Sequence, residues 1–284
     1  MTLETIVKVR RVAGRIGAEV TGVKLTPDLD PALLAEIESA LKEHKVLFFR
    51  NQHHLDDQSH EAFAKRLGEL YAHPTVPVKE NTKAIFELDS EQGAKANVWH
   101  TDVSSVPEVP KYSVLRGVTI PEVGGDTVWA NTNTAYESLP QALKDFVDQT
   151  WAIHSNQFDY SAAAARKEYA KVFASTVYQT RHPIVHVHKE TGKKHLLLGG
   201  FVRQFEGYST SESEALLGIL QSHVTRLENT VRWNWQQGDV VIWDNLATQH
   251  YAIADYDEKR VVRRVTVGKN VPISIDGVES SILS

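Results

Sequence analysis

The stretch from Gly238 to Val267 reads GDVVIWDNLATQHYAIADYDEKRVVRRVTV and contains two strand-like runs joined by a polar connection. Both runs, Val240–Trp243 and Val261–Val267, are short and rich in β-branched and aromatic residues, which favours strands. Further runs of this kind occupy residues 46–49, 112–118, 127–130, 184–188, 195–198 and 230–235. Their density in the second half of the chain predicts a fold built mainly from β-strands.

Helical periodicity marks three segments beside these strands. Residues 30–44 carry apolar side chains at helical spacing, with Asp30 placed to cap the helix and Pro31 in its first turn. Two more helices are expected at 59–70 and at about 211–224. Strands and helices do not alternate regularly, which argues against a doubly wound parallel sheet. We therefore expect a mainly β (α+β) fold with flanking helices around a jelly-roll, or double-stranded β-helix, core.

The composition narrows the possible chemistry. The 284 residues include no cysteine, which excludes disulfides, thiolate zinc sites and iron–sulfur clusters, so a bound metal would need nitrogen and oxygen ligands. A net charge of −5 with scattered basic residues argues against a nucleic-acid partner. We find no signal peptide and no apolar stretch approaching the ~20 residues of a membrane span. The sequence thus predicts a single domain, 1–284, in a cytoplasmic protein with no membrane partner.

Three histidines are followed two residues later by an acidic residue, and 13 histidines with 36 acidic residues would produce a few such pairs by chance. The pair at 54 and 56 lies in a polar, loop-like stretch. His188 and Glu190 lie at the tip of a hairpin predicted over 186–198, where a charged pair is ordinary surface chemistry. His182, His186 and His188 alternate along one run, which suits a half-exposed polar strand better than a second metal site.

The third pair, His100 and Asp102, lies in NVWHTDVSS, which suggests a strand end with both side chains on one face. By itself it fits a buried hydrogen-bonded pair as well as a metal site. With the distant His250 it would form a two-histidine, one-carboxylate triad, typical of non-haem Fe(II) oxygenases. Such a triad leaves three positions open on an octahedral ion, enough for a bidentate 2-oxo acid and O₂. Zinc would more often take these ligands tetrahedrally.

Eight motifs spread over the chain resemble one enzyme family. They are GRIGAEVTGVKL (14–25), HKVLFFR (44–50), LGELYAHP (67–74), WHTD (99–102), GGDTVWANT (124–132), ENTVRWNW (228–235), WDNLATQHY (243–251) and RVVRRVT (260–266). Together they resemble the taurine dioxygenase family of Fe(II)/2-oxoglutarate-dependent dioxygenases, and within it the alkylsulfatase dioxygenases most. The resemblance implies catalysis with Fe(II), 2-oxoglutarate and O₂.

The resemblance also assigns roles to residues. His100, Asp102 and His250 take the positions of the iron ligands, and Arg260 with Thr127 those that hold 2-oxoglutarate. Arginine suits that task because its planar fork binds a carboxylate through two hydrogen bonds. The substrate-binding positions fall on His73, Arg264, Val103, Ser105, Val76 and Phe201. Of these, His73 and Arg264 match the pair that binds a sulfate or sulfonate group.

Some positions depart from the taurine enzymes. Lys95, Ala96 and Val76 stand where a substrate amine would need polar partners, so a more apolar sulfated or sulfonated small molecule is favoured. Ser105 replaces a common Phe and should enlarge or rehydrate the pocket. The implied reaction hydroxylates the carbon next to a sulfate ester and releases aldehyde and sulfate, with succinate and CO₂. A homo-oligomer, dimer or tetramer, is expected.

Three other functions remain open from the sequence. The first is a sulfonate, taurine or aryloxyalkanoate dioxygenase of the same fold, which would differ only in pocket residues such as Val76, Ala96 and Ser105. The second is a zinc-dependent hydrolase on the same three ligands. The third is a non-catalytic jelly roll that binds anions through Arg264 and His73.

Overall fold

The computed structural model describes residues 7–92, 96–157 and 176–283, and its largest sheet has eight strands. The order is β1-β2-β3-β14-β6-β16-β4, and β5 also pairs with β16. All neighbours run antiparallel except β2 and β3. The strands are β1 (Lys8–Arg11), β2 (Ala18–Thr21), β3 (Val46–Phe49), β4 (Leu70–Tyr71), β5 (Phe86–Asp89), β6 (Tyr112–Thr119), β14 (Val240–Asp244) and β16 (Val261–Val267).

The other strands form three smaller sheets. One is β13-β7-β15, one is β12-β8-β9-β17, and one is the hairpin β10-β11. Their bounds are β7 (Thr127–Asn131), β8 (Trp151–Ser155), β9 (Gln179–Pro183), β10 (Val185–Val187), β11 (Lys194–Leu196), β12 (Val202–Phe205), β13 (Thr230–Trp233), β15 (Thr248–Ala252) and β17 (Ser281–Ile282). The helices are α1 (Pro31–His44), α2 (Asp57–Leu67), α3 (Thr132–Glu137), α4 (Gln141–Gln149) and α6 (Thr210–Val224).

An aromatic core fills the space between the eight-stranded sheet and the sheet β13-β7-β15. Phe48 of β3 stacks on Trp233 of β13 with ring centroids 4.1 Å apart, and Trp129 of β7 meets Trp243 of β14 edge-on at 5.7 Å. Both tryptophans of the second pair are fully buried. Two sheets that face each other across such a core form the sandwich of a jelly roll.

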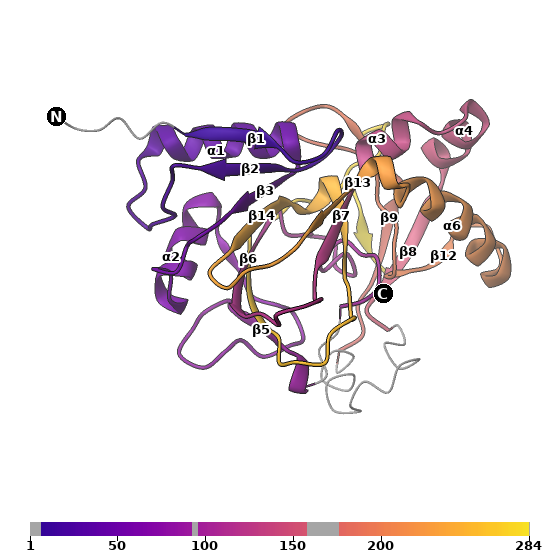
Figure 1. Cartoon of the computed structure of the whole chain (residues 1–284). Coiled ribbons are helices and arrows are strands. Elements are labelled where there is room, and N and C mark those ends of the chain that lie inside the picture. Colours follow the sequence, from indigo (N-terminus) through magenta and orange to yellow (C-terminus); the bar gives the residue numbers. More distant parts are fainter. Residues whose placement is uncertain (1–6, 93–95, 158–175, 284) are drawn as a thin grey trace.

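Helices cover the outer faces. Side chains alternate along β14, so Val241 and Trp243 point into the aromatic core while Val240 and Ile242 join a second core with α1 and α2. A third core lies under α3, α4 and α6, which flank the opposite side of the molecule (Figure 1). A strand buried on both faces reads as a continuous apolar run, which explains the pattern of residues 240–243.

The mainly β jelly-roll fold with flanking helices is confirmed. The three expected helices are present as α1, α2 and α6, although α2 begins two residues earlier and ends three residues earlier than predicted. The hairpin over 186–198 is present as β10-β11. At the predicted strand end, His100 forms an isolated antiparallel bridge with His250, but the chain then turns over residues 102–105 and Val103 has a left-handed φ of 57°, so the strand does not extend to Asp102.

Two predictions about the other histidine pairs were also wrong. His188 is buried and contacts Asp244, with Nε2 and Oδ2 2.9 Å apart, so it is not part of the surface. His182 and His186 are buried too, and each contacts a backbone carbonyl. The two histidines lie on different strands, β9 and β10, and both side chains are covered rather than half-exposed.

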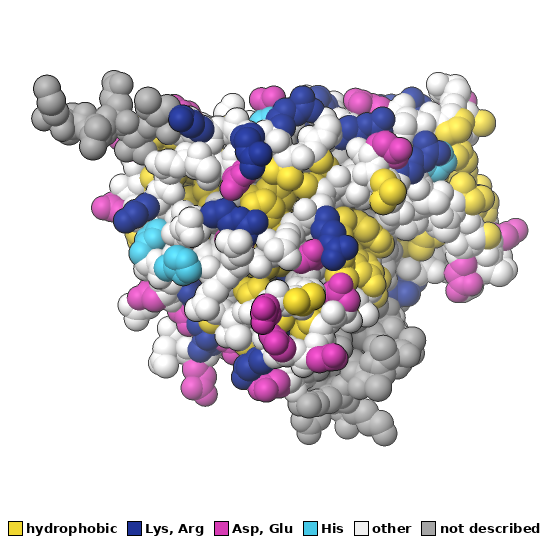
Figure 2. Space-filling model, viewed as in Figure 1, with side chains coloured by type: hydrophobic (Ala, Val, Ile, Leu, Met, Phe, Trp, Pro, Cys, Tyr) yellow, Lys and Arg dark blue, Asp and Glu magenta, His cyan; other side chains and the backbone are white. Residues whose placement is uncertain are grey.

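Two features of the described chain concern possible partners. Within residues 7–92, 96–157 and 176–283, no helix has the length and apolar character that crossing a membrane requires. Acidic and basic side chains are interspersed over the face shown in Figure 2.

Candidate active site

Strand β15 pairs with the segment around His100, and this pairing brings two histidines together. His250, in the middle of β15, exchanges two backbone hydrogen bonds with His100, with N–O distances of 3.1 and 2.9 Å. The imidazole rings lie side by side, with centroids 4.1 Å apart. The pairing joins positions 150 residues apart in sequence, so it depends on the completed sandwich.

Asp102 completes a buried cluster with these histidines. Its Oδ1 lies 3.6 Å from Nε2 of His100 and 3.7 Å from Nε2 of His250. In the described part of the chain, this is the one group of three or more potential ligand residues whose donor atoms all lie within 4.8 Å of one another. Two imidazoles and a carboxylate facing one point form a donor set for a divalent transition metal.

The surroundings orient the His100 ring and favour the neutral form of His250, which is the form that a metal needs. Nδ1 of His100 lies 2.6 Å from the carbonyl oxygen of Val98, so Nδ1 carries the proton and Nε2 presents its lone pair to the cluster. Burial, together with His100 and Arg264, lowers the pKa of His250 far below its ordinary value. Nδ1 of His250 is buried and has no hydrogen-bond partner among the described residues.

Asp102 is held as a carboxylate. Burial alone would raise its pKa, but the net effect of its neighbours, with the Arg264 guanidinium foremost, lowers it. Nη1 of Arg264 donates to Oδ1, and Oγ of Ser113 donates to Oδ2 at 2.7 Å. Both oxygens of the carboxylate are therefore oriented by neighbours.

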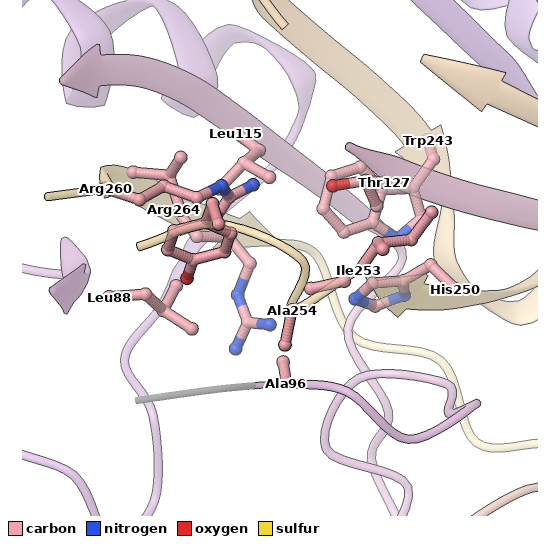
Figure 3. A pocket seen from close by; sticks show the side chains of 13 residues that line it. Leu88, Ala96, Leu115, Thr127, Trp243, His250, Ile253, Ala254, Arg260 and Arg264 are labelled. Carbon is pink, nitrogen blue, oxygen red and sulfur yellow. The ribbon is translucent and has the colours of Figure 1, made fainter. Parts of the chain in front are cut away.

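A cavity beside the cluster contains two arginines. Figure 3 shows Arg260 and Arg264 on one side and His250 with Thr127 on the other. Nε of Arg260 donates to the carbonyl of Gly125 at 3.0 Å, and burial lowers the pKa of this arginine. Most other lining residues are apolar: Leu88, Ala96, Leu115, Ala252, Ile253, Ala254 and Val262. The cavity thus suits a ligand with anionic ends and an apolar body.

His73 lies close to Arg264 at this site. Nδ1 of His73 accepts hydrogen bonds from the N–H groups of Thr75 and Val76, at 3.3 and 3.0 Å, so a neutral His73 carries its proton on Nε2. Burial, and then Arg264, lowers the pKa of His73 to about 3. The rings of His73 and Phe86 lie 5.3 Å apart, and the Arg264 guanidinium lies 5.1 Å from the same Phe86 ring.

The remaining predicted substrate residues lie at different distances from the cluster. The ring of Phe201 lies 6.2 Å from that of His100, and Val103 follows Asp102 directly in the buried turn. Like Phe201 and Val103, Ser105 is buried outside the lining of the cavity, and its carbonyl accepts from Oγ1 of Thr180 at 2.7 Å. Lys95 lies outside the described residues.

Sequence reasoning missed several residues that touch the site. Trp235 donates from Nε1 to Oγ1 of Thr127 at 3.0 Å, Ser113 bonds Asp102, and Asn245 bonds the backbone of Asp102. The signal for Asn245 was its position after a strongly apolar strand and five residues before His250. Nothing in the spacing marks Ser113, because its partner depends on how the strands cross.

Known proteins match this chain over nearly its whole length. Residues 8–266 match the family described as "Taurine catabolism dioxygenase TauD, TfdA family". Over 276 residues the chain is 56% identical to an alpha-ketoglutarate-dependent sulfate ester dioxygenase from Pseudomonas putida, covering 95% of this chain and 92% of the relative. Over 279 residues it is 54% identical to an alkylsulfatase from Acinetobacter baylyi, covering 96% and 88%.

A solved structure agrees with these matches. A taurine dioxygenase from Burkholderia xenovorans superposes on this chain with a TM-score of 0.84 at 37% identity, covering 98% of this chain and 95% of that one. The common sandwich and the sequence match together show that the chain belongs to the TauD, TfdA family of dioxygenases.

Proposed function

We propose that the protein is an Fe(II)- and 2-oxoglutarate-dependent dioxygenase that hydroxylates the carbon bearing a sulfate ester. The hydroxylated product would collapse to an aldehyde and inorganic sulfate, with succinate and CO₂ formed from 2-oxoglutarate. One observation carries the proposal: a cavity lined by two arginines and by His250, a member of the buried His-Asp-His cluster. The names of the two curated relatives, which describe sulfate ester and alkylsulfatase activities, support the same substrate class.

His100, Asp102 and His250 would hold the metal ion. The donor set fits, because two imidazoles and an ionised carboxylate face one buried point. Iron bound there would supply, with 2-oxoglutarate and O₂, the oxidant for hydroxylation of a C–H bond. The protein's own part is to hold these three side chains together beside the cavity.

Arg260 and Thr127 would bind the distal carboxylate of 2-oxoglutarate. Because Nε of Arg260 is bonded to Gly125, the two Nη groups can face the ligand. Oγ1 of Thr127 accepts the indole N–H of Trp235, so the hydroxyl proton of Thr127 can donate to the carboxylate. Aromatic and aliphatic side chains line the cavity around both groups, and apolar surroundings strengthen hydrogen bonds of this kind.

Arg264 and His73 would bind the sulfate group. The guanidinium of Arg264 reaches the cluster through Asp102 and has a buried Nε with no partner among the described residues. Neutral His73 can donate from Nε2, as the bonds at its Nδ1 require. A sulfate held by these two donors presents its adjacent carbon toward the metal side of the cavity.

Apolar side chains favour an alkyl substrate over an amino-substituted one. Ala96 lines the cavity, Val76 lies beside His73, and neither side chain can accept a hydrogen bond from an ammonium group. Sulfonate, taurine and aryloxyalkanoate substrates remain the alternative within this fold, and zinc-dependent hydrolysis is the alternative of a different class.

We further propose that residues 1–284 form a single domain, that the protein is a homo-oligomer and that it is located in the cytoplasm.

The decisive assay measures succinate and sulfate released by the Fe(II)-loaded protein. A panel of linear alkyl sulfates, alkyl sulfonates, taurine and aryloxyacids should be compared at saturating 2-oxoglutarate. We expect succinate and sulfate to form in equal amounts with alkyl sulfates, and only in air. Sulfate release without 2-oxoglutarate would favour the zinc-dependent hydrolase. Turnover confined to aryloxyacids would favour an aryloxyalkanoate dioxygenase.

The metal ligands can be tested one at a time. His100→Ala, Asp102→Ala and His250→Ala should each reduce 2-oxoglutarate turnover at least about a thousandfold, because two ligands do not hold the ion in a facial arrangement. The amount of bound iron should fall below about one tenth of an ion per protein chain. The cooperative thermal unfolding transition of each variant shows whether it folds, and a folded variant with full activity would remove that residue from the triad.

A further inference from the structure

The 3₁₀ turn Asn245–Ala247 between β14 and β15 meets the peptide of Asp102. The Asn245 side chain is fully buried and makes three hydrogen bonds to the backbone. Its Oδ1 accepts from the N–H of Asp102 at 2.8 Å, and its Nδ2 donates to the carbonyls of Asp102 and Pro110, both at 3.0 Å. One amide side chain thus satisfies the donor and the acceptor of the Asp102 main chain.

Asp102 needs such support because no strand holds it. The chain turns after Thr101, and Val103 adopts a φ of 57°, which is strained for a β-branched residue. Backbone in such a conformation persists only where the surroundings fix it. Asn245 bonds both the N–H and the carbonyl of Asp102, the residue just before Val103. It therefore supplies the hydrogen bonds that a neighbouring strand would otherwise supply.

The turn that carries Asn245 is itself fastened to buried histidines. Asp244 contacts His188, with Oδ2 and Nε2 2.9 Å apart, and its Oδ1 accepts from the N–H of Ala247 at 3.2 Å. Nε2 of His186 lies 2.8 Å from the carbonyl of Leu246. These contacts give two of the buried histidines a structural task, which is to hold the turn against the hairpin β10-β11.

We propose that Asn245 is a positioning residue that holds Asp102 in the orientation needed to bind the metal ion. The inference rests on the proposed function, because it requires that Asp102 be a ligand. Without Asn245, the peptide of Asp102 can rotate, and the carboxylate must be ordered again when the metal binds. Losing an outer contact of this kind typically weakens metal binding ten- to a hundredfold.

The test compares Asn245→Ala with a matched control, Asn229→Ala. Asn229 is also fully buried and its side chain also makes three hydrogen bonds, but its partners are His223, Arg15 and Thr134 rather than Asp102. Mn(II) is titrated into metal-free full-length protein, and free Mn(II) is followed by its electron paramagnetic resonance signal. Thermal melting of each protein measures the loss of stability.

We expect the Kd for Mn(II) to rise at least tenfold in Asn245→Ala and to stay within twofold of wild type in Asn229→Ala, although both lose stability. Equal affinity in all three folded proteins, or an equal loss in both variants, would overturn the inference. If Asn245→Ala does not fold, Asn245→Ser replaces it, because the hydroxyl fills part of the space and can keep one bond. Wild-type protein that binds no Mn(II) would overturn the proposed function as well.

Discussion

Arg260 and Arg264 lie four residues apart and line one cavity, yet their contacts differ. Arg260 bonds the backbone of Gly125, and Arg264 bonds Asp102. Arg260→Ala should raise the KM for 2-oxoglutarate at least about thirtyfold, because losing a charge-assisted bidentate pair costs about 2 kcal/mol or more. Arg264→Ala should instead raise the KM for the alkyl sulfate, and it should also weaken metal binding because Arg264 bonds Asp102. Steady-state kinetics with each substrate varied in turn separates the two effects.

The chain provides a control between these two arginines. Arg263 faces the other side of β16 and pairs with Glu87 and Asp57 at 2.7 and 2.9 Å. Arg263→Ala should leave both KM values within about twofold. If Arg260→Ala and Arg264→Ala both raised only the KM for 2-oxoglutarate, the assignment of Arg264 to the sulfate would be wrong.

The choice of substrate also belongs to single residues. An ammonium group that enters a partly desolvated pocket must find an acceptor, and Ala96 and Val76 offer none through their side chains. Each methylene of an alkyl chain buried there contributes about 0.8 kcal/mol. We expect kcat/KM for a linear alkyl sulfate of several carbons to exceed that for taurine at least about a hundredfold. Comparable values would contradict the alkyl sulfate preference and leave the dioxygenase function intact.

At the scale of elements, the turn before β7 fits against the loop before β16. Gly124 has a φ of 83°, and a Cβ there would lie 2.5 Å from the carbonyl oxygen of Asp255. Gly124→Ala should therefore cost about 1–3 kcal/mol of stability and raise the KM for 2-oxoglutarate, because the displaced loop leads into Arg260. Thermal melting and 2-oxoglutarate kinetics measure the two effects.

Gly218 provides a control that separates this strain from a general effect of replacing glycine by alanine. A Cβ on Gly218, inside α6, would meet nothing within 4 Å. Gly218→Ala should stabilise the protein by about 0.5–1 kcal/mol, because alanine loses less conformational freedom in a helix. Unchanged kinetics and stability in Gly124→Ala would show that the two loops can move apart without harm to the site.

Elements also show what sequence can predict and where it fails. Helix α1 was predictable because its apolar spacing and its Asp30 cap are local signals. Strands β8 and β9 were missed because WAIHS and QTRHP mix polar and apolar residues, and their histidines are buried only once the sheet has formed. The cluster around Asp102 was found by residue type, but its left-handed turn and the Asn245 contacts depend on segments about 140 residues away.

At the scale of the whole molecule, buried histidines make stability depend on pH. His60 and His182 are fully buried and burial lowers the pKa of each to about 3, and burial lowers that of His186 to about 4. The unfolded chain binds these protons near the ordinary pKa of about 6.5, and the folded chain does not. The contribution of these histidines to stability should therefore be nearly constant above pH 7 and should be lost as the pH drops from about 6.5 toward 4.

The size of this loss can be measured on the metal-free protein at constant ionic strength. At pH 5 each of the three histidines should cost about 2 kcal/mol relative to pH 8, so the melting temperature should drop by about 10 °C or more. His60 allows a check, because its Nε2 lies 3.2 Å from the carbonyl of Val114, a contact that Gln can reproduce without titrating. Between pH 8 and pH 5, the melting temperature of His60→Gln should fall less than the melting temperature of the wild-type protein. A melting temperature that stays level over this range would mean that these histidines accept protons inside the folded core.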